Sequence, residues 1–174
     1  MTSKLKTDVL ETVSGSGTIA LNSQLSGTTY ESMAAGSVIQ VVQTYAATTS
    51  AIETTSSSDV ASGVSATITP KYTNSLILIS FSLSMSQGAT AGAAMRARMY
   101  LNGAVMAGSS IYQIGYNYNA TNQYSPIVFN GSHTATSLAS LTFAPYFNST
   151  TSGSMVRFAH TSASYALTLT EIKQ

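Results

Sequence analysis

The chain has 174 residues, no cysteine and a formal net charge of +1, and only 7% of its residues are charged. The lack of cysteine excludes disulfides and thiolate metal sites, and the low net charge excludes a field that would attract nucleic acid or an anionic membrane. No apolar run reaches the roughly 18 residues that span a bilayer, and the amino terminus has no apolar signal segment, so we expect no membrane insertion.

The amino-terminal part, 1–36, is predicted to be an attachment segment and linker. Residues 1–31 hold five of the thirteen charged residues, and two β-patterned runs, 9–13 and 18–21, flank a Gly-rich turn and predict a hairpin. A lone hairpin buries too little surface to be stable in water, so we expect it to dock on a neighbouring chain or another protein. The candidate attachment residues are its apolar side chains: Val9, Leu10, Val13, Ile19 and Leu21.

The linker leads into a β-rich domain. Residues 22–37 are rich in Ser, Thr and Gly and predict a linker with one helical turn around 30–35. The run 38–44 predicts the first strand of the domain, and the Ser/Thr-rich passage 45–59 holds at most one short strand, near Ile52.

The strongest β signal is the stretch 75–86, which predicts a central strand around which the domain is built. Alternate side chains point to opposite faces of a strand, and this stretch alternates apolar residues with serine. One face carries Ile77, Ile79, Phe81, Leu83 and Met85, and the other carries Ser80, Ser82 and Ser84. Leu76 and Leu78 add apolar surface to the serine face, so we expect this end of the strand to be covered on both sides.

Two Asn-Gly pairs punctuate the next part of the chain. Asn102-Gly103 lies between the alternating run 95–101 and the run 104–106, and it predicts a tight hairpin because both turn positions need positive φ. Asn130-Gly131 is expected to end the apolar run 127–129.

The remaining pattern predicts the fold class. Residues 141–147 predict a strand pair or one strand bent at Pro145, and 155–160 and 165–172 predict the last two strands. About eight to ten short strands without a helix predict an all-β fold, an antiparallel sandwich of jelly-roll type over residues 37–174.

The sequence offers no catalytic constellation. After residue 37 the acids are Glu53, Asp59 and Glu171, which we interpret as solvated loop acids. His133 and His160 have no carboxylate at a suggestive spacing, so they do not predict a metal site. No nucleophile-elbow, P-loop or dinucleotide motif is present. We therefore expect no enzymatic activity and no cofactor.

A tyrosine-rich stretch is the one binding candidate. Tyrosine presents an apolar face with a polar tip, which suits stacking on a sugar or a protein contact, but ordinary strand and loop tyrosines, or an interface between copies of this chain, explain the pattern more simply. The four residues are Tyr112, Tyr116, Tyr118 and Tyr124. Arg96 and Arg98 share a strand face and Arg157 lies on another strand. These arginines either pair with acids across a subunit interface or are exposed.

Several stretches resemble the small fibre-type structural proteins of tailed bacteriophages. Residues 4–22 are similar to the amino-terminal segments of phage fibre and virion surface proteins. The entry to the globular part, the strand-turn-strand core and two later strands are represented by 36–42, 65–70, 74–79, 100–105 and 166–172. Leu76 departs from the pattern, since such proteins often have a basic residue there.

The resemblance implies a homotrimeric fibre or spike with an amino-terminal attachment segment and a β-sandwich knob. We expect a virion structural protein of the tail-fibre type, assembled in the host cytoplasm. Its expected partners are further copies of itself, other virion proteins through 1–31, and a host cell-surface glycan or protein, without nucleic acid. The segment 100–155 has no charged residue, and such low charge protects a monomer poorly against self-association.

Two alternatives remain at this point. One is a head decoration protein or head fibre without a receptor role. The other, from a different functional class, is a carbohydrate-binding module that uses the tyrosines as a stacking platform.

Overall fold

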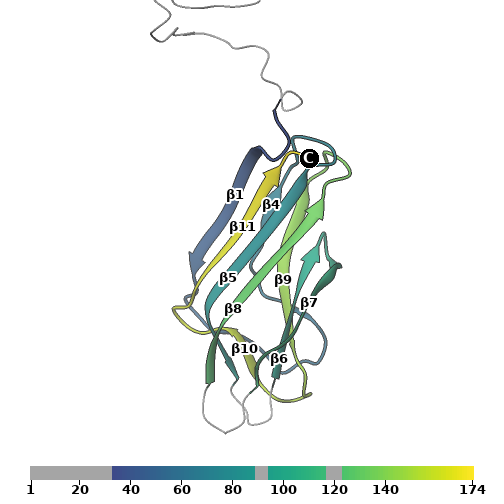
Figure 1. Cartoon of the computed structure of the whole chain (residues 1–174). Helices are drawn as coiled ribbons and strands as arrows, with labels where there is room; N and C mark the ends of the chain where they lie inside the picture. The colour runs from purple at the N-terminus through teal and green to yellow at the C-terminus, as the bar shows by residue number, and fades with distance from the viewer. Residues whose placement is uncertain (1–32, 89–93, 117–122) are drawn as a thin grey trace, which may run out of the picture.

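The computed structural model describes residues 33–88, 94–116 and 123–174, and these residues form an elongated all-β domain without a helix (Figure 1). No helix in these ranges is long and apolar enough to cross a membrane. The strands are β1 Val38–Ala47, β2 Ile52–Thr54, β3 Val60–Ala61, β4 Ala66–Ile68, β5 Leu76–Gly88, β6 Ala94–Leu101, β7 Ala104–Tyr116, β8 Gln123–Thr134, β9 Leu141–Ser149, β10 Val156–Ala159 and β11 Ser164–Ile172.

The strands form two antiparallel sheets. Sheet A has the order β1-β11-β5-β8, and β10 and β2 extend it beside the last residues of β5. Sheet B has the order β9-β6-β7, with β3 and β4 both paired to the free side of β9. The principal pairs are nested along the chain, because β1 pairs with β11, β4 with β9, β5 with β8, and β6 with β7.

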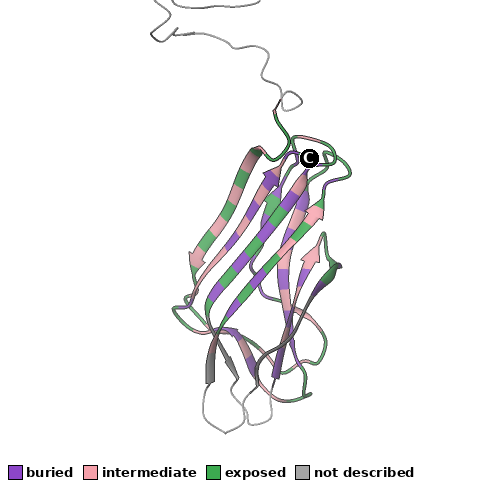
Figure 2. Ribbon diagram, viewed as in Figure 1, coloured by how far each residue is buried: buried purple, intermediate pink, exposed green. Residues whose placement is uncertain are grey.

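The predicted central strand is confirmed as β5, which lies between β11 and β8. Its inward side chains Ile77, Ile79, Phe81 and Leu83 are buried, and Ser80, Ser82 and Ser84 are exposed, so buried and exposed residues alternate along this part of the strand (Figure 2). The described residues do not provide the expected cover on both sides of the strand's start, because Leu78 points away from the core and is 41% exposed.

The first Asn-Gly prediction is confirmed and the second is wrong. Asn102 and Gly103 have φ of 50° and 82° and join β6 to β7. Asn130-Gly131 instead lies inside β8, in register with Ser80 and Ile79 of β5. A Cβ at Gly131 would lie 2.7 Å from the ring of Phe129, so this glycine provides space for an aromatic side chain and makes no turn.

The core lies between the two sheets and is closed by aromatic contacts. The ring of Phe158 lies 5.8 Å from that of Phe81 in sheet A and 5.1 Å from that of Phe147 in sheet B. All three rings are buried, and a residual cavity between the sheets measures about 10 Å³, which leaves little room for even one water. The sequence of residues 141–147 allowed either a strand pair or one strand bent at Pro145. The structure has a single strand, β9, that continues through Pro145.

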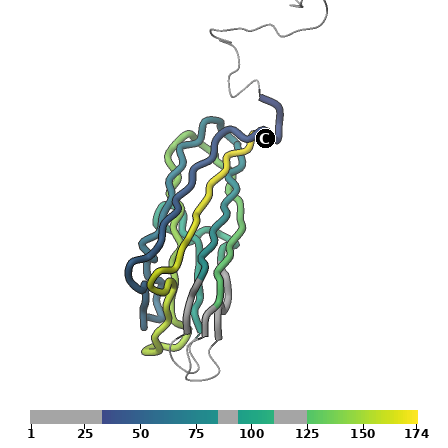
Figure 3. Tube along the Cα trace, turned by 90° about the vertical axis from the view of Figure 1, so that its left-hand side faces the viewer, coloured from purple at the N-terminus to yellow at the C-terminus, as the bar shows by residue number. Residues whose placement is uncertain are grey.

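The two ends of the sandwich differ in what they carry. At one end Val38, Ile172, Leu76 and Thr134 lie in one row across sheet A, and Lys173 exchanges backbone hydrogen bonds with residues 36 and 37. The described chain therefore starts and finishes at this end (Figures 1 and 3). At the other end Gly88 pairs with Gln123, and Ala94 pairs with Tyr116.

Candidate functional site

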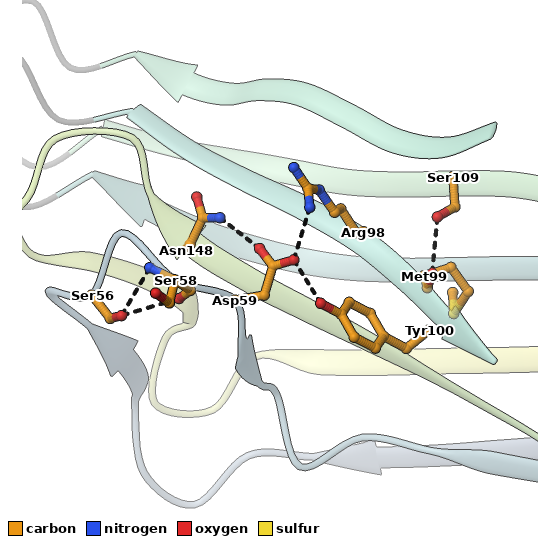
Figure 4. A network of polar contacts seen from close by, with 8 residues as sticks. All are labelled: Ser56, Ser58, Asp59, Arg98, Met99, Tyr100, Ser109 and Asn148. Atoms are coloured by element: carbon orange, nitrogen blue, oxygen red, sulfur yellow. Dashed lines mark hydrogen bonds and ion pairs between the residues drawn. The ribbon is translucent and has the colours of Figure 1, made fainter. Parts of the chain in front are cut away.

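A cluster of polar side chains lies on the outer face of sheet B, centred on Asp59 (Figure 4). One carboxylate oxygen of Asp59 accepts a hydrogen bond from the Asn148 amide at 2.5 Å. The other accepts one from the Tyr100 hydroxyl at 2.7 Å and one from the Arg98 guanidinium at 3.1 Å. The side chain of Asp59 is only 10% exposed, so this ion pair is partly shielded from solvent.

Strand alternation brings the partners of Asp59 together. Met99 and its neighbours at odd positions of β6 point into the core, so Arg98 and Tyr100 project from the opposite side. Tyr146 of β9 stands next to Arg98 in register, and its ring stacks on that of Tyr100 at 3.8 Å. The segment before β3 then crosses this surface and supplies the carboxylate.

The cluster closes a loop and contains no activated nucleophile. Burial raises the pKa of Tyr100 above its ordinary value of 10.0, and the hydrogen bond to Asp59 raises that pKa further. Tyr100 is therefore a neutral donor at physiological pH. Backbone bonds from Ser149 to Ser56 and from Ser62 to Pro145 fasten the same segment to β9.

The expectation of solvated loop acids is wrong for Asp59 and for Glu171. Glu171 is fully buried, and its carboxylate accepts hydrogen bonds of 2.6–3.1 Å from the Gln40 amide, the Ser75 hydroxyl and two backbone N–H groups. The N–H groups belong to Lys71 and Tyr72, so Glu171 organises the turn before β5. Burial of a carboxylate is tolerated when several donors replace its lost hydration.

The remaining ionic contacts answer the question left open for two of the three arginines. Arg98 pairs with Asp59, and Arg157 pairs with Glu53 at 2.7 Å. Both pairs form within one chain, and the second joins β10 to β2 at a more exposed position.

The two histidines lie apart and in different surroundings. The His133 ring stands at a right-angled orientation 6.1 Å from that of Phe143, whereas His160 lies in the turn between β10 and β11. Within residues 33–88, 94–116 and 123–174, no three His, Asp or Glu side chains gather as a group that could hold a metal ion.

The two long sides of the sandwich close differently. On one side β1 is joined to β4 through hydrogen bonds from the Thr44 hydroxyl to Ser65 and from the Gln40 amide to Thr69. On the other side a cleft of about 410 Å³ separates the start of β7 from the end of β8. The cleft is lined by residues 101 and 104–107 of one sheet and 132–134 of the other. Only the packing of the sheets brings these segments together, so the sequence carried no signal for it.

The predicted binding residues lie at or beyond the limits of the described structure. The side chains of Tyr112, Tyr116 and Tyr124 and the whole of Tyr118 fall outside it. The backbones of β7 and β8 place residues 116 and 123 at the end of the sandwich opposite Val38. The candidate attachment residues Val9, Leu10, Val13, Ile19 and Leu21 also fall outside the described residues.

Comparison with known proteins adds little to this description. No family model matches the sequence, and no curated protein does. Among solved structures, the crystal structure of dimeric latent PorU from Porphyromonas gingivalis is similar with 12% sequence identity and a TM-score of 0.39. The match covers 80% of this chain and 14% of that one. A likeness this weak carries no statement about function.

Proposed function

We propose that this chain is a structural protein of a bacteriophage virion, of the tail-fibre type. Residues 1–36 attach it to the particle, and the domain 37–174 is a homotrimeric β-sandwich knob presented for contact with the host surface. The observation that carries the proposal is the bipolar layout of the domain. The attachment segment enters at the end that holds Val38 and Lys173, and the tyrosine-rich strand ends lie at the other.

The distance between the two ends suits an anchored, outward-facing piece. β5 runs from one end to the other in 13 residues, which corresponds to roughly 40 Å of extended strand. A binding surface at the far end is thereby held away from the surface to which the amino terminus is fixed.

The nested strand pairing supports a jelly roll for the knob. In a jelly roll the first strand pairs with the last, and successive pairs follow inward to a central hairpin. Here the outermost pair is β1 with β11, and the innermost is the hairpin of β6 with β7. The resemblance to phage fibre proteins and the low charge of the chain support the virion role and the trimer.

The test for attachment uses purified particles from the producing strain. We expect the protein to remain with the particles through density-gradient purification, and labelled antibodies to decorate the tail. Decoration of the head would favour a head decoration protein. A protein found only in the particle-free fraction, and binding glycans there, would favour a carbohydrate-binding module and contradict the virion role.

The test for host contact uses one double variant in the tyrosine-rich stretch and one control variant. Tyr116→Ala together with Tyr118→Ala is expected to lower adsorption of particles to host cells without releasing the protein from them. Tyr72→Ala, in the turn that leads into β5 at the opposite end, is the matched control. Equal adsorption of all three particles would contradict a receptor role for the tyrosines.

A further inference from the structure

We propose that the outer face of sheet A is the surface by which copies of this chain pack on one another. This inference rests on the self-assembly in the proposed function and names its surface. The face consists of the side chains that point away from the core at odd positions of β1 from 41 to 47 and at even positions of β5 from 76 to 84, β8 from 126 to 134 and β11 from 164 to 172. We call it the uncharged face.

Charge is missing from the whole of this face. Its residues are Ser, Thr, Ala, Asn, Gln, Pro and a few larger apolar side chains. The charged residues of sheet A lie elsewhere, because Glu171 and Lys173 are buried at one end and the Arg157–Glu53 pair lies on β10 and β2 at the other. Depletion of charge is what distinguishes the centre of a protein interface from ordinary surface.

Exposed apolar side chains gather on the same sheet. Among the described residues seven large hydrophobic side chains are exposed, and five of them lie on β1, β5 and β8 of sheet A. They are Val38 at 53%, Val41 at 57%, Tyr45 at 70%, Leu78 at 41% and Val128 at 60%. Single exposed apolar side chains are ordinary on a protein surface, but their concentration on one uncharged sheet favours this sheet as a contact surface.

The strand register determines where large and small side chains stand on the uncharged face. Tyr45, Ala166, Ser82 and Val128 lie in one row across the four strands. In this row the large side chains therefore stand on the two outer strands and the small ones on the two central strands. In a parallel row nearer the Val38 end, Thr170 lies between Val41 and Leu78, so an exposed apolar side chain stands on either side of it.

The area of the face fits association between copies. Four strands about 4.8 Å apart, each about nine residues long at about 3.3 Å per residue, cover roughly 600 Å². In a cyclic homotrimer each copy turns this face toward its two neighbours, so three such faces would bury roughly 1,800 Å² in total, on the scale of a standard protein interface. A second copy brings no like charge to the contact, and it supplies the cover over Leu78 that the sequence predicts and the described part of one chain does not provide.

The outer face of sheet B is a poorer candidate. It carries Arg96, Arg98 and Asp59, and the chain's own segment before β3 already covers part of it. Contact between copies through that face would place the like charges of neighbouring arginines together.

The test measures self-association of the full-length chain by sedimentation velocity over a range of micromolar concentrations. We expect an oligomer for the wild type and self-association weakened by about 100-fold or more in Ser82→Lys, because each copy would bury an unpaired ammonium group. Thr136→Lys adds the same charge at an exposed position between β8 and β9 and is expected to associate like the wild type. Unfolding by urea confirms that both variants remain folded.

A second variant measures whether residue 82 is covered in the oligomer, without disrupting the assembly. The chain has no cysteine, so Ser82→Cys introduces a single reactive thiol. We expect this thiol to react with a maleimide reagent more slowly in the concentrated oligomer than after dilution, and the thiol of Thr136→Cys to react equally in both.

Three results would overturn the proposal. Ser82→Lys that assembles like the wild type excludes the uncharged face. Dissociation by Leu10→Lys but not by Ser82→Lys assigns assembly to the amino-terminal segment instead. A wild-type chain that stays monomeric at high micromolar concentration removes self-assembly altogether. The virion role is judged separately by whether the protein remains with purified particles, so each failure is distinguishable.

Discussion

The two outer faces of the sandwich are built by the same strand alternation but use polarity in opposite ways. On sheet B, Arg98 and Tyr100 project outward and meet a carboxylate delivered by the chain's own loop. On sheet A the outward positions of the four long strands hold hydroxyls, small residues and exposed apolar side chains, and none of them is charged.

The contrast shows where a chain with so few charged residues places them. In the described domain its acids fasten loops and short strands to the sheets, each with a partner supplied by the same chain. The face without such a loop is left neutral, and this neutrality is one reason why we propose it as the contact surface between copies. Four substitutions test this division, from the largest expected effect to the smallest.

Glu171→Ala is expected to have the largest effect, a loss of about 3 kcal/mol in the free energy of unfolding. The substitution leaves the backbone N–H groups of Lys71 and Tyr72 and the Ser75 hydroxyl without their acceptor. Urea denaturation measures the loss. Thr170→Ala, the neighbouring outward position on β11, is the control and should cost far less. Equal losses would mean that the buried Glu171 carboxylate contributes no more to the free energy of unfolding than the outward Thr170 side chain.

Asp59→Ala is expected to cost about 2 kcal/mol, since three donors on sheet B lose one carboxylate. Asp59→Asn keeps the shape and one acceptor oxygen, so its loss should be smaller. The measurement is again the urea midpoint at neutral pH. If Asp59→Ala unfolds at the wild-type midpoint, the covered face of sheet B is not fastened by this cluster.

The dependence on pH gives a third test of the same cluster. Because burial and Asp59 raise the pKa of Tyr100 in the folded state, stability from its neutral form is complete below the unfolded value of 10.0 and is lost as pH rises through the folded value. The difference in unfolding free energy between the wild type and Tyr100→Phe should therefore be constant near pH 8 and fall above about pH 10. A difference that stays constant up to about pH 11 would contradict a raised pKa.

Glu53→Gln is expected to have the smallest effect, less than about 1 kcal/mol, because the Glu53–Arg157 pair is exposed to solvent and screened by salt. The loss should shrink further in about 1 M sodium chloride. A loss as large as that of Asp59→Ala would show that the greater solvent exposure of the Glu53–Arg157 pair does not make it weaker than the Asp59–Arg98 pair.

Local rules predicted much of the fold but only half of the site. Alternation from 75 to 86 was sufficient for β5 and its buried face, and Asn102-Gly103 was sufficient for the hairpin. The same alternation places Arg98 and Tyr100 on one side of β6. Their partner Asp59 is 39 residues away from Arg98 in sequence, and no spacing rule reaches that far.

What the sequence by itself determined is therefore the identity of the strands and the side on which each residue lies, because both depend only on neighbours along the chain. Only the tertiary structure decided which acids are buried, because the donors to Glu171 come from residues 96 to 131 positions away. It also decided that Asn130-Gly131 stays inside a strand, since pairing with β5 on one side and the Phe129 ring next to it outweigh the local preference for a turn. Leu78 shows both levels, because its apolar character can be read from the sequence and its 41% exposure only from the tertiary structure.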